Sequence, residues 1–499
     1  MKSISSLLTR KNNSSKIPTI LLAKNEVRYQ KITTGNERTM TIYLVSAVAA
    51  LAGLLFGFDT GIISGALMFI QKDFPLTTLM KELIVSSVLL GAMLGSLGTG
   101  YLTDRFGRRS VILVISGMFI LGTFIAAYAS NVATIILGRF CIGIAIGVGS
   151  YTAPLYIAEV APLSIRGGLV SLNQLAITIG IMCSYFIDYA FTDTAASWRW
   201  MFAFGIIPAV LLGLGMLVLP ESPRWLVKQN LLEKAKQTLS YLRKSNHIEN
   251  ELNEIQNSLK IREAKFSEVF SAWIRPVLFL GIALAFLQQV TGINTIIYYA
   301  PTIFKLAGFQ STSSTILATV GIGVVNVLAT IFAVFYLDKI GRRPLLLIGI
   351  AGMGICLACL SFTLQGGTEL MRWASVASIF IYVICFAFGL GAMLWLLVSE
   401  IFPLEVRGMA MGVAVFNCWL WNFAVSATFL TLLEALGPTH TFLGYAVMCV
   451  IGLVICYFIV PETNGVSLEQ IEANIRKGLP LREIGQPVFR PDPVLESNR

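Results

Sequence analysis

The sequence predicts an all-α polytopic membrane protein, with twelve transmembrane helices arranged in two pseudo-symmetric halves of six. Of its 499 residues, 56% are hydrophobic and only 13% are charged, whereas a soluble globular protein carries about 25% charged residues. Apolar runs long enough to cross a hydrocarbon core of about 30 Å recur from residue 42 to residue 460. A third observation, an internal repeat, divides these runs into two halves.

Twelve spans can be placed along the chain. They cover 42–66, 82–103, 110–129, 132–156, 168–190, 199–219, 276–304, 314–337, 344–364, 372–398, 409–433 and 441–460. The polar stretch between the sixth and seventh spans is rich in Glu, Lys, Leu and Gln, which indicates short amphipathic helices on a membrane surface. The expected units are a disordered N-terminal tail, a first half, a linker, a second half and a C-terminal tail, at 1–40, 41–219, 220–275, 276–460 and 461–499.

Three motifs occur twice, in the same order and after the corresponding spans. DRFGRR at 104–109 returns as DKIGRR at 338–343, and the pattern ExxPxxxRG at 159–167 returns at 400–408. PES at 220–222 returns as PET at 461–463, closing each half. The repeat predicts two parallel six-span halves, an arrangement found in transporters that bind their substrate near the midplane between repeats.

Acidic residues accompany the basic turns of this repeat. Arginine in such turns is expected as a topology signal alone, but that reading leaves the acids unexplained. Arginine forms planar, bidentate pairs with carboxylates, so we expect a charge network that ties helix ends together and breaks when that face opens. Its expected members are Asp104, Arg108, Glu159, Arg166, Glu221, Asp338, Arg342, Glu400, Arg407 and Glu462.

The positive charge of the chain sets its orientation. The formal net charge is +10, but the basic residues gather in the tails and alternate loops, which argues against nucleic-acid binding and places both termini in the cytoplasm. No cleavable signal peptide is visible. The C-x-x-C at 356–359 has no His or acidic neighbour, and no constellation of an enzyme appears. We therefore expect no metal, no cofactor and no catalysis.

One carboxylate, Asp59, stands in the middle of the first span. An ionisable group at that depth costs about 2.5–3.5 kcal/mol on insertion scales, so it usually faces a cavity or a partner. Asp59 is either a proton-carrying site or a fixed member of a salt bridge. Arg139, the sole formal charge within its span, either snorkels to the interface or approaches Asp59. In the second arrangement, burial would favour the protonated form of Asp59 and the neighbouring cation would favour its charged form. A proton-coupled cycle requires such a balance.

The seventh span concentrates amides, Gly and Pro in the run QQVTGINTIIYYAP at 288–301. Gly and Pro permit a broken helix where it lines a cavity. Gln288, Gln289 and Asn294 each offer a donor and an acceptor, which suits a neutral polyhydroxyl compound, and Gln174 adds an amide from the first half. Hydrogen bonds between helices are the alternative role.

Three tryptophans, Trp395, Trp419 and Trp421, lie within spans rather than at their ends. An aromatic belt would place them at the interfaces, so we expect at least two of them to face the cavity. Trp419 and Asn422, three residues apart, share a helix face. Trp421 lies off that face and is consistent with packing.

These residues together resemble the sugar porter family of the major facilitator superfamily, over nearly the whole chain from about residue 42 to residue 485. The resemblance is carried by the motifs FGFDTGIISG (56–65), GRF (138–140), PESPRWL (220–226), QQVTGINTIIYYAP (288–301), SEIFPLEVRG (399–408) and PETNGVSLEQIE (461–472). NQLAITIGI (173–181) and KGLPLREIG (477–485) are most similar to bacterial galactose– and arabinose–proton symporters.

The resemblance implies a proton-coupled monosaccharide importer of the inner membrane, monomeric, that works by alternating access. Asp59 is then the proton acceptor, Arg139 its coupling partner and Tyr298 the gate. Sugar contacts fall on Gln174, Gln288, Gln289, Asn294, Trp395, Trp419 and Asn422. A facilitative uniporter of the same fold, with Asp59 structural, and a sugar sensor that does not transport are the alternatives.

Two positions depart from the family pattern. Ala392 stands where the family often has Pro in the run before Trp395, so bending there is expected to differ. Cys418 stands where Asn or Gln is common, and a thiol is a poor substitute for an amide. The sugar is therefore left open.

Overall fold

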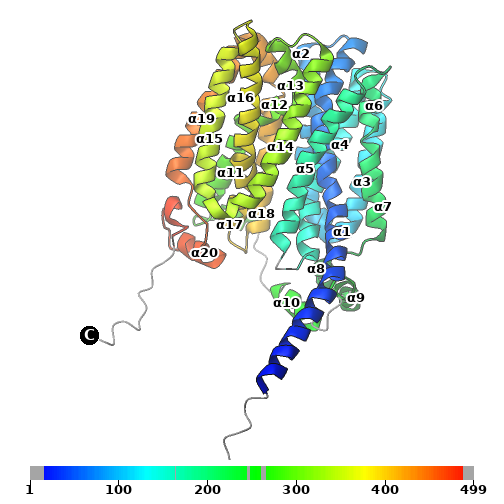
Figure 1. The fold of residues 1–499 in the computed structure, drawn as a ribbon, viewed down its shortest axis with the longest axis vertical. Helices are drawn as coiled ribbons and strands as arrows, with labels where there is room; N and C mark the ends of the chain where they lie inside the picture. Colours follow the sequence, from blue (N-terminus) through cyan, green and yellow to red (C-terminus); the bar gives the residue numbers. More distant parts are fainter. Residues whose placement is uncertain (1–15, 163–164, 244–247, 260–265, 487–499) are drawn as a thin grey trace, which may run out of the picture.

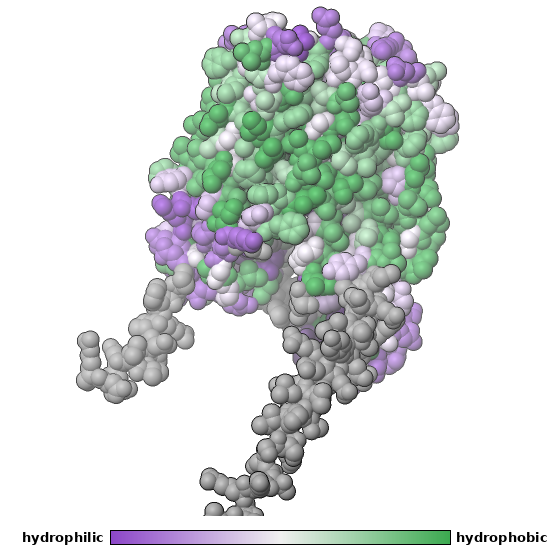
Figure 2. Space-filling view, viewed as in Figure 1, coloured by the Kyte–Doolittle hydropathy of each residue, from purple (hydrophilic) through white to green (hydrophobic). Residues whose placement is uncertain are grey.

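The computed structural model describes residues 16–162, 165–243, 248–259 and 266–486, which form helices and no strand. Twelve of its segments are long and apolar enough to cross a membrane, which confirms the predicted fold class. Figure 1 shows the first half, coloured from blue to blue-green, beside the second half, coloured from green to orange. On the face shown in Figure 2, a broad band of apolar side chains covers the bundle, with hydrophilic side chains toward both ends.

The first half contains seven helices that make six spans, because α6 and α7 together form the sixth. They are α1 (Lys16–Asp73), α2 (Thr78–Phe106), α3 (Arg108–Ala127), α4 (Val132–Val160), α5 (Arg166–Ala190), α6 (Ser197–Ala203) and α7 (Ile206–Val218).

The second half contains nine helices that carry the other six spans. They are α11 (Arg275–Val290), α12 (Ile293–Tyr298), α13 (Ala300–Leu306), α14 (Thr312–Ile340), α15 (Arg342–Thr363), α16 (Glu369–Phe388), α17 (Leu390–Ile401), α18 (Arg407–Ser426) and α19 (Phe429–Ile459).

The linker and the C-terminal tail lie at the end of the bundle that carries both termini (Figure 1). The linker forms α8 (Pro223–Lys228), α9 (Leu232–Arg243), α10 (Ile248–Leu259) and the 3-10 turn η1 (Phe266–Phe270), and the tail forms α20 (Leu468–Arg476) and η2 (Leu481–Glu483). The linker helices pack their apolar sides on one another, around Leu226, Leu239 and Ile255. They therefore have a small core of their own, which the expectation of separate surface helices did not include.

The structure differs from the expected disorder of residues 1–40. Helix α1 already begins at Lys16 and continues without a break into the first span. The stretch from residue 19 to residue 34 has neither Gly nor Pro, and half of its residues are Leu, Ala, Lys, Gln, Glu or Arg, which are good helix formers. Residues 1–15 lie outside the described part of the chain.

The ends of the last two helices also differ from the expectation. The eleventh helix ends at Ser426, seven residues before the expected end. A new helix starts at Phe429 and bends at Gly437, whose φ of +74° precedes Pro438. The expected loop at 434–440 contains this interruption, because Gly437 has non-helical dihedral angles and Pro438 follows it.

A row of four glycines lets α1 lie directly against α5. Gly53, Gly57, Gly61 and Gly65 recur every fourth residue, and a Cβ atom at any of them would meet atoms of α5. Small residues at this spacing allow close approach of membrane helices. The contact fixes the helix that carries Asp59 against its neighbour within the first half.

Hydrogen bonds between the halves gather at one end of the bundle. Tyr185 on α5 donates to the carbonyl of Ile297 on α12, and Glu82 on α2 accepts two bonds from Thr431 on α19. These bonds, together with that of Thr78 to Glu434, lie toward the end of the bundle opposite the termini. The structure is therefore a conformation that is closed at that end.

Candidate functional site

Asp59 on α1 and Arg139 on α4 form a buried, two-pronged ion pair. Arg139 Nη1 and Nη2 lie 3.4 and 3.3 Å from Asp59 Oδ1 and Oδ2. Arg139 Nε donates to the carbonyl of Ile84 at 2.7 Å. The exposed fractions are 0% for Arg139 and 3% for Asp59, so Arg139 does not snorkel. Protonation of Asp59 would remove one charge of the pair and loosen the contact between α1 and α4.

The seventh span is broken twice, as its Gly and Pro content indicated. α11 ends at Val290, and Gly292 adopts a φ of +90° before α12 begins. Tyr382 donates to the carbonyl of Thr291 at 2.8 Å, which satisfies one backbone group freed by the break. A second interruption at Tyr299 separates α12 from α13. The break turns the amides of this span toward the other helices of the second half.

The amides of the seventh span form one network with Cys418 on α18. Gln289 Nε2 lies 3.0 Å from Gln288 Oε1 and 3.1 Å from Cys418 Sγ. The thiol in turn donates to Gln288 Oε1 at 3.2 Å, and Asn294 Nδ2 donates to Gln289 Oε1 at 2.7 Å. Gln288 also donates to the carbonyl of Leu390, so the network joins α11, α12, α17 and α18.

A second polar contact lies beside this network. Asn422 Nδ2 donates to the hydroxyl of Tyr298 at 3.3 Å, and Ser426 donates to Asn422 Oδ1 at 3.1 Å. Tyr298 is fully buried on α12, which contacts α1 of the other half. The predicted gate residue therefore joins a predicted binding residue close to the boundary between the halves.

The tryptophans and Gln174 divide into two groups. Trp419 is buried and its ring lies 5.3 Å from that of Phe56 on α1, across the two halves. Trp421 packs on Phe286 at 4.7 Å, as the packing interpretation proposed. Trp395 on α17 and Gln174 on α5 are partly exposed and join neither polar network among the described residues.

The bend before Trp395 is present although Pro is absent. Gly389, with φ −88° and ψ −113°, separates α16 from α17. Gly389 also packs against Gly349 of α15 so closely that a Cβ atom at either position would collide with the other. Ala392 therefore does not remove the interruption of the tenth span.

In the first half, the repeated motifs meet at the turn between α2 and α3. Glu159 lies 2.9 Å from Arg108 Nε, and Ser222 donates to the same carboxylate at 2.5 Å. Glu221 accepts the backbone N–H groups of Arg108 and Arg109 at 3.0 and 3.1 Å. A carboxylate at a helix N-terminus is stabilising, so Glu221 caps α3 from a distant segment. Burial raises the pKa of Glu221, while the N–H donors of Ser222, Arg109 and Arg108 oppose that shift.

The second half repeats this arrangement with the equivalent residues. Arg342 Nη2 donates to Glu400 Oε1 at 3.1 Å, and Thr463 donates to Glu400 Oε2 at 2.5 Å. Glu462 accepts the backbone N–H groups of Arg342 and Arg343, both at 3.1 Å. The sequence repeat is thus a repeat of hydrogen bonds, each set lying within one half.

Two members of the expected network, Arg166 and Arg407, lie outside these carboxylate sets. Glu159 and Glu400 bind the arginines of the Gly-Arg-Arg turns rather than Arg166 and Arg407 of their own motifs. Arg407 Nε donates to the carbonyl of Phe402, and Arg166 Nε is buried without an acceptor among the described residues. Asp104 joins Arg108 and Lys228, whereas the side chain of Asp338 lies outside the described residues.

We expect Glu159→Gln to lower the stability of the protein by about 3 kcal/mol, because Arg108 is only 8% exposed and would lose its main carboxylate. Thermal or denaturant unfolding in detergent measures the loss. Glu249→Gln is the matched control, since Glu249 pairs with Lys236 at an exposed site and surface pairs contribute little. Equal midpoints for the two variants would contradict the prediction.

Two buried acids were missed at the level of sequence. Glu82 on α2 is 1% exposed and accepts from both the backbone N–H and the hydroxyl of Thr431, each at 2.8 Å. Asp188 on α5 is also 1% exposed and accepts from the backbone N–H of Gly65 at 3.0 Å. An acid within an apolar helix was the available signal, but both lie close to the expected span ends.

The comparison with known families agrees with this geometry. A family model described as "Sugar (and other) transporter" matches residues 45–475. The chain belongs to the sugar transporter family. This confirms the resemblance to the sugar porters, whose members are transport proteins rather than enzymes.

Curated members of the sugar transporter family match over most of the chain. The galactose-proton symporter of Escherichia coli K12 is 41% identical over 90% of this chain and 98% of its own. The D-xylose transporter of Levilactobacillus brevis is 42% identical over 88% of this chain and 97% of its own. The inward-open structure of the xylose transporter XylE from E. coli superposes with a TM-score of 0.77 at 32% identity, covering 87% of this chain and 99% of that one.

Proposed function

We propose that this member of the sugar transporter family is a proton-coupled monosaccharide importer that works by alternating access. The observation that carries the proposal is the buried Asp59–Arg139 pair in the first half, set in a chain whose second half presents a broken span lined with amides. Asp59 takes up and releases a proton, and the amides of the broken span bind a neutral polyhydroxyl compound. Relatives named for galactose, xylose and arabinose symport support the class of substrate.

The proposed cycle follows from the two polar sites. A proton on Asp59 neutralises its carboxylate and frees Arg139, which favours sugar binding from outside. The halves then rock about the site, and loss of the proton on the other side restores the pair. Tyr298 acts as the gate, because its hydroxyl bridges to Asn422 beside α1. At the opposite end, Glu159 and Glu400 with their arginines hold the helix ends together within each half.

The amide network is the proposed sugar site. Gln288, Gln289 and Asn294 already hydrogen-bond one another. In this structure they therefore serve as hydrogen bonds that join helices. A sugar hydroxyl replaces such bonds with equivalent ones when it binds. Trp419 offers an apolar ring face, while Gln174 and Trp395 complete the site from α5 and α17.

We further propose that the protein lies in the bacterial inner membrane as a monomer with both termini in the cytoplasm. Basic residues concentrate in the tails and in the linker and turns at the same end, in accord with the positive-inside rule. The end closed by Glu82 and Thr431 is then extracellular. The conformation described above faces the cytoplasm.

Uptake by proteoliposomes at two pH values tests the proposal. A panel of hexoses, pentoses and inositol is offered with an acidic exterior, while sugar and external pH are followed together. We expect at least one monosaccharide to accumulate above its external concentration, with alkalinisation of the medium. Uptake without proton movement would select the uniporter, and binding without uptake would select the sensor.

Cys418 provides a test of the sugar site itself. We expect Cys418→Asn to tighten sugar binding by up to about tenfold, because an amide donates and accepts more strongly than a thiol. Dissociation constants for the panel of sugars measure the effect. Cys456→Ala, a buried cysteine of α19 outside the amide network, is the matched control. Unchanged affinity for every transported sugar would contradict a role for residue 418 in the site.

A further inference from the structure

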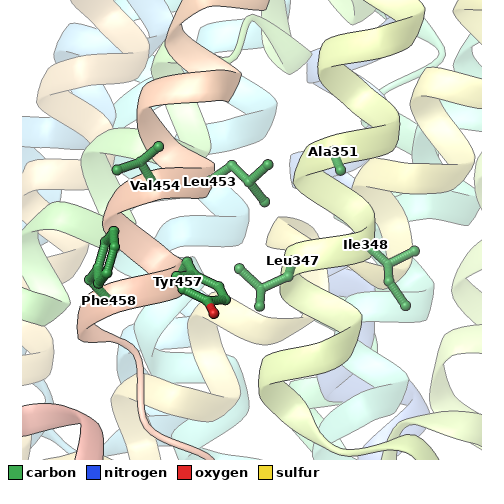
Figure 3. A pocket seen from close by; sticks show the side chains of 7 residues that line it. All are labelled: Leu347, Ile348, Ala351, Leu453, Val454, Tyr457 and Phe458. Carbon is green, nitrogen blue, oxygen red and sulfur yellow. The ribbon is translucent and has the colours of Figure 1, made fainter.

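A groove opens on the outer surface of the second half, between α15 and α19. Its volume is about 430 Å³. Leu347, Ile348 and Ala351 line one side, and Leu453, Val454 and Tyr457 line the other. In Figure 3, Leu453 and Tyr457 point from α19 toward Leu347. Ile348 and Val454 are 58% and 51% exposed, so the groove opens to the surroundings of the bundle rather than to its interior.

Two arginines stand at the end of this groove nearest the termini. Arg343 lies one helical turn before Leu347, and its Nη2 donates to the carbonyl of Tyr457 at 2.7 Å. The guanidinium carbons of Arg343 and Arg482 lie 5.3 and 5.5 Å from the ring centre of Tyr457. Because the spans end near Arg342 and Ile459, both cations stand at the level of the membrane interface.

The charge of these arginines is not neutralised within the described part of the chain. Neither forms an ion pair there, and Arg343 Nε is shielded from solvent without an acceptor. The nearby carboxylate of Glu462 is engaged with backbone N–H groups of Arg342, Arg343 and Asn464. The apolar groove therefore has a positively charged end.

The equivalent place in the first half has only part of this arrangement. Arg109, the repeat counterpart of Arg343, donates its Nε to the carbonyl of Met216 at 2.8 Å and its Nη2 to that of Leu217 at 2.7 Å. Met216 replaces the aromatic ring of Tyr457, and Gly117 occupies the place of Ala351. The repeat thus supplies an internal reference that has one arginine but neither the aromatic ring nor the second arginine.

We propose that this groove binds one anionic phospholipid, with an acyl chain along Leu347, Ala351 and Leu453 and the phosphate on Arg343 and Arg482. Basic sites between membrane helices at the interface recognise anionic head groups. The groove continues from these two cations into the hydrocarbon region, so it can hold an acyl chain while the cations hold the phosphate. A soluble anion would leave the apolar groove without a role. A second protein chain would leave the two cations at the membrane interface without a role.

Native mass spectrometry of the delipidated full-length protein tests the proposal with phosphatidylglycerol and phosphatidylcholine as probes. We expect one phosphatidylglycerol to bind at a lower concentration than phosphatidylcholine does. Arg343→Gln and Arg482→Gln should each weaken that binding about fivefold. Ala351→Trp should fill the groove and abolish the preference, whereas Gly117→Trp, the repeat counterpart on an open surface, should leave it intact.

Several results would overturn the proposal. Equal binding of the two lipids would remove the recognition of charge, and equal effects of the two tryptophan variants would remove the groove. Displacement of the lipid by inorganic phosphate alone would show a site for free anions, and a dimer mass lost in Ala351→Trp would show a second copy instead. If Ala351→Trp lowers the unfolding midpoint, Arg482→Gln, exposed beyond the last span, decides the question by itself.

Discussion

Replacing Asp59 with asparagine should abolish uphill sugar accumulation while sugar exchange at equal concentrations continues. Asparagine has nearly the same shape but carries no proton across the cycle. With one proton per sugar, a gradient of one pH unit supports about tenfold accumulation, and in Asp59→Asn this ratio should fall to one. Uptake by proteoliposomes with and without a pH gradient measures both properties. Undiminished accumulation would show that the proton travels elsewhere.

The expected defect needs two controls, because Asp59→Asn leaves the buried guanidinium of Arg139 without its carboxylate. Removing one partner of a buried pair costs about 3–5 kcal/mol. Asp59→Asn combined with Arg139→Gln restores neutrality and separates lost coupling from lost stability. Asp188→Asn is the matched single variant, since Asp188 is equally buried but has no cation partner among the described residues. Asp188→Asn should still accumulate sugar.

Glu82→Ala should open the end of the bundle opposite the termini. Glu82 accepts two hydrogen bonds from Thr431 in the first turn of α19, and bonds to charged groups contribute about 1.5–3 kcal/mol each. Even one such loss shifts an equilibrium between closed and open forms by roughly tenfold or more. We expect faster hydrogen exchange over residues 429–436 and a larger fraction of outward-open molecules.

The matched variants for Glu82→Ala differ in what they retain. Glu82→Gln keeps an acceptor for the backbone N–H of Thr431 and a donor for its hydroxyl, so it should exchange hydrogen at nearly the normal rate. Glu434→Ala removes the exposed contact to Thr78 and should have a smaller effect. Identical exchange in Glu82→Ala and the unaltered protein would show that this carboxylate does not hold the end closed.

The sequence was sufficient for the number of spans and the repeat. It offered the pairing of Asp59 with Arg139 as one of two alternatives, because charge within apolar helices is rare. It was not sufficient for the partner of each arginine in the turns. Glu221 and Glu159 come from segments distant in sequence, and only the folded half places both at Arg108. Glu82 was missed for a related reason. Its partner belongs to the other half, and its position near a span end made it look like an interface residue.

The hydrogen bonds between the halves lie at one end of the bundle, and this has a consequence for the rates of influx and efflux. The repeated carboxylate sets at the termini-bearing end are closed within each half, whereas the bonds of Glu82 must break before the opposite end can open. In the absence of sugar and gradient, the resting population is therefore biased toward one orientation. Such a carrier is kinetically asymmetric: the initial rates of influx and efflux differ at matched saturating concentrations, although the amino-acid sequence of its two halves repeats. A chain whose two halves repeat in sequence would thus transport sugar with different maximal rates in the two directions.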